Sequence, residues 1–198
     1  MERPNRVTQD IEAKISPDTV LFFDLDGTLV DTNFANFLSY KKAIQSVTKS
    51  EIDLVYVPNQ RFNRSVLINK ISNLTENEYD RIIKEKEHYY KDFLTETKIN
   101  KTVTDILFKY SKANKNVLVT NCREERAVMI LNYHGLMDKF SSVFFRQFNN
   151  GNEKINKFQY AIQTLAISPK LIVVFENEKS EIEDAIQAGI ISYNLIKL

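Results

Sequence analysis

The sequence predicts an α/β fold in which a parallel, Rossmann-like sheet carries an inserted helical cap. Short apolar runs alternate with segments of helical periodicity over most of the chain. The runs are continuously apolar, as strands are when helices cover both faces of a parallel sheet. One helical stretch is too long to be a connection between two strands. We therefore expect a polar lead-in at residues 1–18, an α/β core at 19–32 and 100–198, and a helical cap at 33–99.

The elements of the first half have clear local signals. The apolar run Val20–Phe23 predicts a buried strand, and Gly27 marks the turn that follows it. Within the cap, Pro58–Gln60 separates two stretches of helical pattern. Thr75 followed by Glu78 has the spacing of a capping box and predicts the start of the last cap helix.

The second half alternates between the two patterns, with glycines at two expected helix ends. In chain order we expect a helix from Lys101, a strand at Asn116–Thr120, a helix at Glu124–His134 ended by Gly135, a strand at Ser142–Phe145, a helix at Lys157–Leu165, a strand at Leu171–Phe175, a helix at Glu181–Ala188 ended by Gly189, and a last strand at Ile190–Ile196.

Composition is that of an ordinary globular protein. The chain has 198 residues, 43% hydrophobic and 27% charged, with a formal net charge of +1. Such a balance gives no reason to expect nucleic acid or a membrane as a partner. The single cysteine, Cys122, allows no internal disulfide, and we find no signal peptide or membrane-spanning run. We expect a cytoplasmic protein, whose oligomeric state the sequence does not indicate.

Two carboxylates, Asp24 and Asp26, stand where the first predicted strand ends. Side chains alternate along a strand, so the two carboxylates can point to the same side. Like charges at such a distance require a cation or a proton between them, which suggests a divalent metal site. A calcium-binding EF-hand loop also contains Asp-x-Asp, but its twelfth position needs a glutamate and here holds Ala35.

The segment Asp24–Thr28 matches Asp-x-Asp-Gly-Thr and resembles the first motif of the haloacid dehalogenase-like hydrolase superfamily. From Val20 to Gly189 the chain resembles helical-cap members, such as phosphoglycolate phosphatases and β-phosphoglucomutase. This resemblance implies a Mg²⁺-dependent phosphatase for a small phosphorylated metabolite. It also implies that Asp24 is the nucleophile that forms an aspartyl-phosphate and that Asp26 is the general acid and base.

The resemblance implies further phosphate contacts. Gly27 and Thr28 complete the first motif, and Thr120 with Asn121 resembles the second, in which a hydroxyl binds a phosphoryl oxygen. Thr120 is equally suited to capping the next helix. A third element is a lysine before the following helix, for which Lys154 is preferred and Lys157 is the alternative.

The fourth motif departs from the family pattern. Asn177 stands where an aspartate that binds Mg²⁺ is expected, and an amide oxygen brings no charge. Glu176, Glu178 and Glu181 are candidates to compensate as metal ligands or as partners of a ligand. Mg²⁺ affinity should therefore be lowered.

Two arginines of the cap, Arg61 and Arg64, follow the Pro58–Gln60 break and are candidates for contacting a second anionic group of the substrate. Exposed, solubilising arginines are the alternative. Three other functions stay open: a degenerate member that binds a phosphorylated ligand or a protein with little turnover, a sugar phosphomutase, and, less compatible with the cap, a receiver-like signalling domain.

Overall fold

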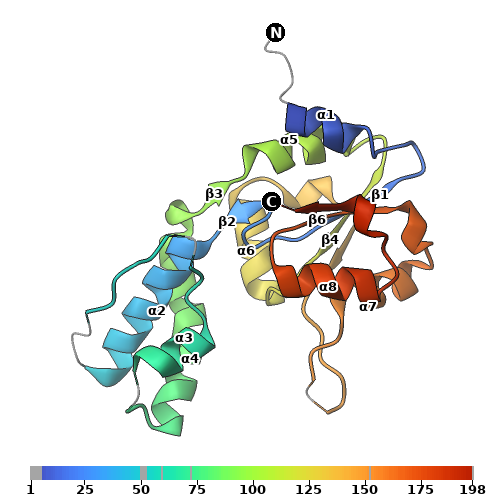
Figure 1. Cartoon of the computed structure of the whole chain (residues 1–198). Coiled ribbons are helices and arrows are strands. Elements are labelled where there is room, and N and C mark those ends of the chain that lie inside the picture. Colours follow the sequence, from blue (N-terminus) through green and yellow to red (C-terminus); the bar gives the residue numbers. More distant parts are fainter. Residues whose placement is uncertain (1–5, 50–52, 59, 72, 152, 198) are drawn as a thin grey trace. The chain divides into compact units, whose positions relative to one another are not determined.

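The computed structural model describes residues 6–49, 53–58, 60–71, 73–151 and 153–197. Asn59, predicted to help break the cap, lies outside these residues. The chain forms two compact units (Figure 1). One comprises the described parts of Met1–Leu29 and Ile99–Leu198, and the other is Val30–Lys98.

The first unit is built on a five-stranded sheet with the strand order β5-β4-β1-β6-β7. Every pairing between these strands is parallel, which confirms the predicted α/β fold. The strands are β1 Val20–Phe23, β4 Lys115–Val119, β5 Ser142–Phe144, β6 Ile172–Glu176 and β7 Leu195–Lys197. Since β1 is the central strand, a side chain that follows it lies between those that follow β4 and β6.

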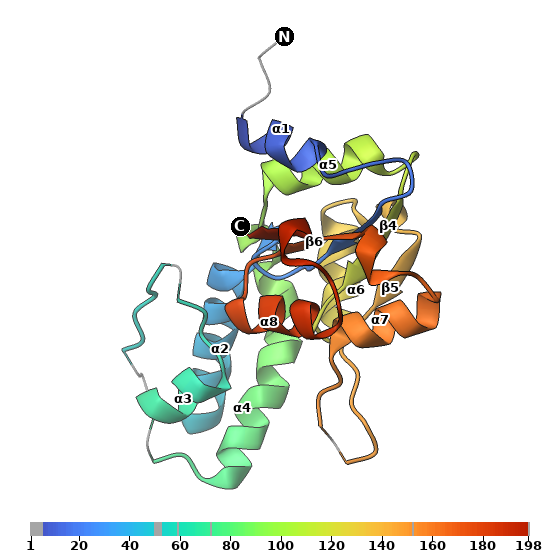
Figure 2. The same ribbon diagram turned by 45° about the vertical axis from the view of Figure 1, so that its right-hand side comes forward.

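Helices and short 3-10 turns precede and connect the strands of this unit. They are α1 Arg6–Glu12, α5 Lys101–Tyr110, α6 Glu124–Tyr133, η2 Met137–Lys139, α7 Lys157–Leu165, η3 Pro169–Leu171, α8 Lys179–Gln187 and η4 Ser192–Asn194. Figure 2 shows α7 and α8 side by side, and α1 beside α5. Phe158 of α7 and Ile182 of α8 pack with Phe22 and Val174 of the sheet. Leu21, on the opposite face of β1, is also buried, as expected for a sheet covered on both faces.

The second unit is helical and has its own apolar core. It contains β2 Val30–Asp31, α2 Asn33–Thr48, α3 Arg64–Lys70, α4 Glu76–Tyr89 and η1 Tyr90–Glu96. β2 pairs with β3 Lys98–Ile99, in which Lys98 is the last residue of this unit. The core packs α2, α3 and α4 together through residues such as Ile44, Leu67 and Ile82. The predicted capping box at the start of α4 is present, with Thr75 and Glu78 bonded in both directions.

Two elements differ from the sequence prediction. The expected loose lead-in contains α1, whose Ile11 is buried and whose Glu12 pairs with Lys109 of α5. The last strand is shorter than predicted because Ser192–Asn194 forms a 3-10 turn, in which the side-chain Nδ2 of Asn194 donates to the carbonyl of Ile172. No helix in the described ranges is both long and apolar enough to cross a bilayer.

Candidate active site

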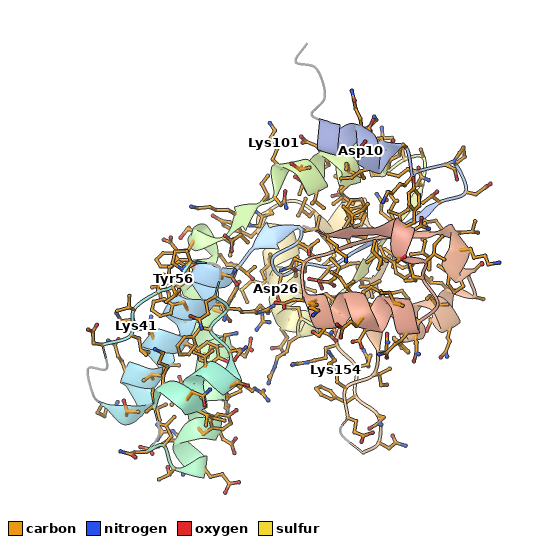
Figure 3. All side chains as sticks on the ribbon, viewed as in Figure 1. Asp10, Asp26, Lys41, Tyr56, Lys101 and Lys154 are labelled. Atoms are coloured by element: carbon orange, nitrogen blue, oxygen red, sulfur yellow. The ribbon has the colours of Figure 1, made fainter. Side chains whose placement is uncertain are left out.

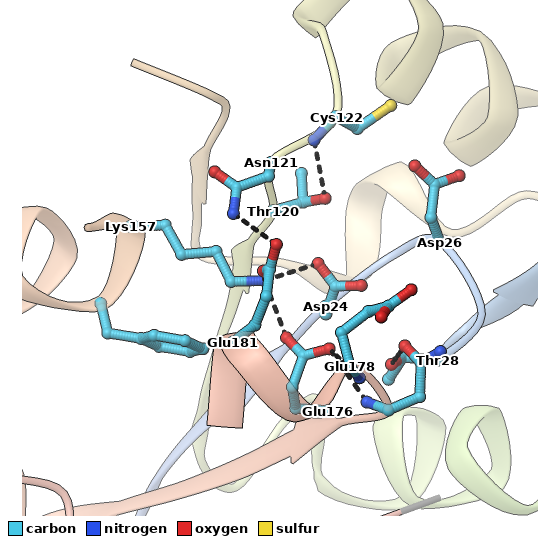
Figure 4. Close-up of polar contacts among 12 residues, drawn as sticks. Asp24, Asp26, Thr28, Thr120, Asn121, Cys122, Lys157, Glu176, Glu178 and Glu181 are labelled. Carbon is cyan, nitrogen blue, oxygen red and sulfur yellow. Dashed lines mark hydrogen bonds and ion pairs between the residues drawn. The ribbon is translucent and has the colours of Figure 1, made fainter. Parts of the chain in front are cut away.

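Polar side chains meet at the carboxyl ends of three neighbouring strands. Asp24 follows β1, Thr120 follows β4, and Glu176 is the last residue of β6. All three side chains are buried (Figure 4). Ligands of open parallel sheets bind at this edge. The sheet therefore brings the predicted first, second and fourth motifs to one place.

Lys157, the first residue of α7, holds the centre of this cluster. Its Nζ donates to Asp24 Oδ1 at 2.8 Å and to Glu176 Oε2 at 2.8 Å, and it also pairs with Glu181 Oε2. Its side chain is only 2% exposed. One buried ammonium thus faces three carboxylates, an arrangement in which the charges largely depend on each other for stability.

The structure does not support the preference for Lys154 over Lys157. Lys154 Nζ lies 3.7 Å from Glu181 Oε1 on a side chain that is 43% exposed, whereas Asp24 is contacted by Lys157. The cause is the position of the helix start, which the Asn156 side chain fixes by accepting from two amides of the first turn. Of the two lysines, Lys157 is consequently the one that reaches Asp24 (Figure 4), and Figure 3 shows where Lys154 lies.

Asn177 packs against the turn that follows Asp24. Its Oδ1 accepts a hydrogen bond from Thr28 Oγ1 at 3.0 Å. Gly27 has φ +85°, and a Cβ added there would lie 2.5 Å from Asn177 Nδ2. Gly27 is required both for its backbone conformation and for this close approach. The predicted Gly27, Thr28 and Asn177 thus belong to one local unit.

We expect Gly27→Ala to destabilise the protein more than Gly135→Ala. Both glycines have a positive φ, but a Cβ at Gly135 would meet nothing within 4 Å. Gly135→Ala should therefore cost only the backbone strain, about 1–2 kcal/mol. Gly27→Ala should add on the order of 1–3 kcal/mol for the displaced Asn177 side chain. Urea unfolding of both variants measures the difference, and equal losses would refute the close-packing argument.

Asp26 has a partner that the sequence reading missed. Arg126 Nη2 lies 3.5 Å from Asp26 Oδ2, and Arg126 Nε donates to Cys122 Sγ at 3.2 Å. Arg126 lies in the helix after the second motif, a position that gives no distinctive signal in a single sequence. The guanidinium holds positive charge beside the carboxylate predicted to be the acid and base.

The second motif forms a tight turn at the end of β4. Thr120 Oγ1 accepts from the amide of Cys122 at 3.1 Å, which closes the turn before α6. The N-cap of α6 is Arg123, so Thr120 does not have the helix-capping role considered for it. Asn121 Nδ2 donates to Glu181 Oε1 at 2.7 Å. Asn121 and Lys157 therefore meet at the same carboxylate, that of Glu181.

Burial and neighbouring charges shift the pKa values of this cluster. Burial raises the pKa of Asp24, with Lys157 opposing that shift. Burial, together with the charge of Asp24, raises the pKa of Glu176 to about 8. Burial alone would lower the pKa of Lys157, but the three surrounding carboxylates outweigh burial and raise it. For Glu181, Lys157 and the hydrogen bonds outweigh burial and hold the pKa below its usual value.

The raised pKa of Glu176 predicts a pH dependence of stability. The folded state holds a proton on Glu176 up to about pH 8, whereas a glutamate of ordinary pKa, 4.5, releases it earlier. Between these values the folded state binds more protons than the unfolded state, so the unfolding free energy falls as the pH rises. This contribution is complete below pH 4.5 and lost above about pH 8.

In buffer with a chelator, we expect Glu176→Gln to flatten the decline of the unfolding free energy over this window. Glu183→Gln, an exposed glutamate of α8, is the matched control. Denaturant unfolding at several pH values measures both. Parallel curves for the wild type and Glu176→Gln would contradict the prediction.

The donor chemistry of the site suits Mg²⁺. Carboxylate oxygens of Asp24, Glu176 and Glu181 lie within 4.8 Å of one another. Lys157 Nζ forms an ion pair with one oxygen of each of these three carboxylates. The second oxygen of Asp24 and the amide oxygen of Asn177 are oxygen donors of the kind that Mg²⁺ prefers. Both oxygens of Glu176 and of Glu181 already accept hydrogen bonds or ion pairs, whereas Lys157 contacts only one oxygen of Asp24. Among the described residues, Asn177 Oδ1 accepts a single hydrogen bond, from Thr28, and its oxygen has a second lone pair for a metal.

Arg61 and Arg64 belong to the helical unit, where Arg64 opens α3. Their predicted contact with a second anionic group of the substrate stays a prediction from the sequence.

Comparison with known proteins identifies the family. The model of the haloacid dehalogenase-like hydrolases matches residues 21–194. The chain belongs to this family. The match spans both units and all four motifs, so this haloacid dehalogenase-like protein is a hydrolase, as the Asp-x-Asp-Gly-Thr segment suggested.

Three known proteins are similar to this haloacid dehalogenase-like hydrolase in sequence or in structure. A protein of Thermotoga maritima named phosphorylated carbohydrates phosphatase is 30% identical over 179 residues, 86% of this chain and 81% of that protein. A structure from Haemophilus somnus, described as a predicted phosphoglycolate phosphatase, is similar with a TM-score of 0.71 and 21% identity over 88% of this chain and 84% of that one. A haloacid dehalogenase-like hydrolase from Streptococcus pneumoniae has a TM-score of 0.68 and 18% identity over 89% and 83%.

Proposed function

We propose that this hydrolase is a Mg²⁺-dependent phosphatase that releases phosphate from a small phosphorylated carbohydrate through an aspartyl-phosphate on Asp24. The observation that carries the proposal is the placement of Asp24, buried after the central strand and hydrogen-bonded to Lys157 at 2.8 Å. Asp26 follows two residues later with Arg126 beside it. The substrate class is suggested by the Thermotoga maritima relative, whose name specifies phosphorylated carbohydrates.

In the first step, an oxygen of Asp24 attacks phosphorus and the bond from phosphorus to the sugar oxygen breaks. Asp26 donates a proton to the departing sugar oxygen, which leaves as an alcohol. Arg126 offsets the negative charge that then remains on Asp26. Lys157 holds Asp24 in place and offers a positive charge near the phosphoryl oxygens.

In the second step, Asp26 takes a proton from water, which attacks phosphorus and restores the Asp24 carboxylate with release of phosphate. Asn121 and Lys157 are suited to hold phosphoryl oxygens during both steps. Mg²⁺, when bound, would supply charge neutralisation for the transferring group. Asp24 and Asn177 are the side chains that would hold it.

Phosphate release from a panel of sugar phosphates and other phosphate monoesters, with Mg²⁺ and with a chelator, tests the proposal. We expect turnover that needs Mg²⁺, is fastest with a phosphorylated carbohydrate, and disappears in Asp24→Asn. Turnover that survives in Asp24→Asn would come from another source. Absence of turnover in the folded wild type would favour the alternative of a protein that binds a phosphorylated ligand, which the neutral Asn177 makes worth testing.

Product analysis separates hydrolysis from the phosphomutase alternative. A phosphatase releases inorganic phosphate and the free sugar in equal amounts. A mutase would instead return an isomeric sugar phosphate with little free phosphate.

A further inference from the structure

The carboxylate of Glu181 is held by the same donors that the proposed function assigns to the substrate phosphate. Asn121 Nδ2 donates to Glu181 Oε1 at 2.7 Å, and Lys157 pairs with Glu181 Oε2. Lys154 Nζ approaches from the exposed side at 3.7 Å. Figure 4 shows Glu181 between Asn121 and Lys157. Glu181 takes no part in the proposed steps of hydrolysis.

Charge makes simultaneous occupation by Glu181 and a phosphate unfavourable. Asp24, Glu176 and Glu181 already surround the single ammonium of Lys157. A phosphate dianion entering beside them would share that ammonium with Glu181 at close range. Like charges at such distances in a poorly solvated site repel strongly.

Glu181 is also placed to move without unfolding its surroundings. It lies in the first turn of α8, and its side chain is 15% exposed, so it stands at the edge of the cluster. Glu176, by contrast, is buried and its second oxygen accepts from the amides of Asn177 and Glu178. Of the two glutamates, Glu181 is the one that a ligand can displace toward solvent.

The Asn121 side chain supports a donor site at this position. Its amide nitrogen faces Glu181, whereas its Oδ1 is buried with no hydrogen-bond partner among the described residues. Buried polar atoms without partners are rare and call for a reason. This orientation of Asn121 directs its amide nitrogen toward an anion, which would account for the unpaired oxygen.

We propose that Glu181 is an internal occupant of the phosphoryl-binding donors, and that a phosphate group binds by displacing its carboxylate from Asn121 and Lys157. Glu181 thereby sets the affinity for the phosphoryl group. This inference rests on the proposed function for the location of the phosphate, but it concerns binding and does not require turnover.

Calorimetric titration with inorganic phosphate, in the presence of Mg²⁺, tests the proposal on the full chain. We compare the wild type with Glu181→Gln and Glu181→Ala, and use Glu183→Gln as a control for the loss of one negative charge on α8. Both Glu181 variants should bind phosphate about tenfold or more tightly than the wild type. This factor corresponds to one hydrogen bond to a charged group, which phosphate forms in the variants without first displacing the Glu181 carboxylate. Glu183→Gln should bind within a factor of about two of the wild type.

The results separate the two proposals. Tighter phosphate binding in the Glu181 variants supports the inference even if no substrate is turned over, in which case only the proposed hydrolysis fails. Equal or weaker binding overturns it and assigns Glu181 to the positioning of Lys157. Absence of phosphate binding in every variant also overturns it, because the donors freed from Glu181 would then form no anion site. We expect each variant to fold, because Lys157 keeps Asp24 and Glu176 as partners in all of them. Thermal unfolding checks this.

Discussion

Asp24→Asn is expected to abolish turnover and, at the same time, to leave the protein at least as stable as the wild type. An amide is no nucleophile, so the rate should fall by on the order of 10⁴-fold or more. Stability should not fall, because burial and the nearby carboxylates raise the pKa of Asp24 and thus disfavour its charge. Lys157 retains Glu176 and Glu181 as partners. The measurements are phosphate release and thermal unfolding.

Asp10→Asn provides the matched control for this variant. Asp10 is an exposed aspartate of α1 (Figure 3), and its replacement should change neither activity nor stability measurably. Asp24→Asn should unfold at a higher temperature by on the order of 2–4 °C for each kcal/mol of relieved repulsion. A clear loss of stability would show that the Asp24 charge supports the fold, and residual turnover above about one per cent would exclude Asp24 as the nucleophile.

Lys157→Met is expected to have the largest effect on stability of any single change at the site. Methionine fills a similar volume but leaves the acidic groups of Asp24, Glu176 and Glu181 without the ammonium that contacts all three. Removing one partner from a buried charge cluster costs about 3–5 kcal/mol. Urea unfolding at neutral pH measures this loss.

Lys154→Met is the matched control for stability, because Lys154 is a neighbouring lysine whose side chain is 43% exposed and whose Nζ lies 3.7 Å from Glu181 Oε1. Its loss should cost less than about 1 kcal/mol. The double variant Lys157→Met with Asp24→Asn should recover part of the stability lost in Lys157→Met, since one unpaired carboxylate is removed. A loss below about 1 kcal/mol in Lys157→Met would contradict the central role given to the ammonium.

The sequence predicted the fold well because its strongest signals are local. The apolar run at Val20–Phe23 coincides with β1, and the helix predicted at Lys157–Leu165 coincides with α7. In a parallel sheet the carboxyl ends of all strands lie at the same edge, so residues that follow different strands come close together. The predicted positions of Asp24 and Glu176 at one edge followed from that rule.

The sequence could not predict which polar groups pair with one another. Choosing between Lys154 and Lys157 depends on the direction of α7 relative to the sheet, which spacing along the chain does not contain. Arg126 was missed for the same reason, and the second oxygen of Glu176 is used by neighbouring backbone amides, a contact invisible in the sequence. The short helix α1 was missed because its seven residues show little apolar periodicity apart from the buried Ile11.

The central position of β1 has a consequence for the order in which the chain can fold during its synthesis. Val20–Phe23 pairs with Lys115–Leu118 on one side and with Ile172–Phe175 on the other. The strand that carries Asp24 therefore emerges from the ribosome long before either neighbour exists, while the helical unit makes its core from residues close in sequence. We expect the helices of that unit to form first, one edge of β1 to stay unpaired until β4 has been translated, and the other until β6 has been translated. During this interval, β1 is a candidate for protection by a chaperone.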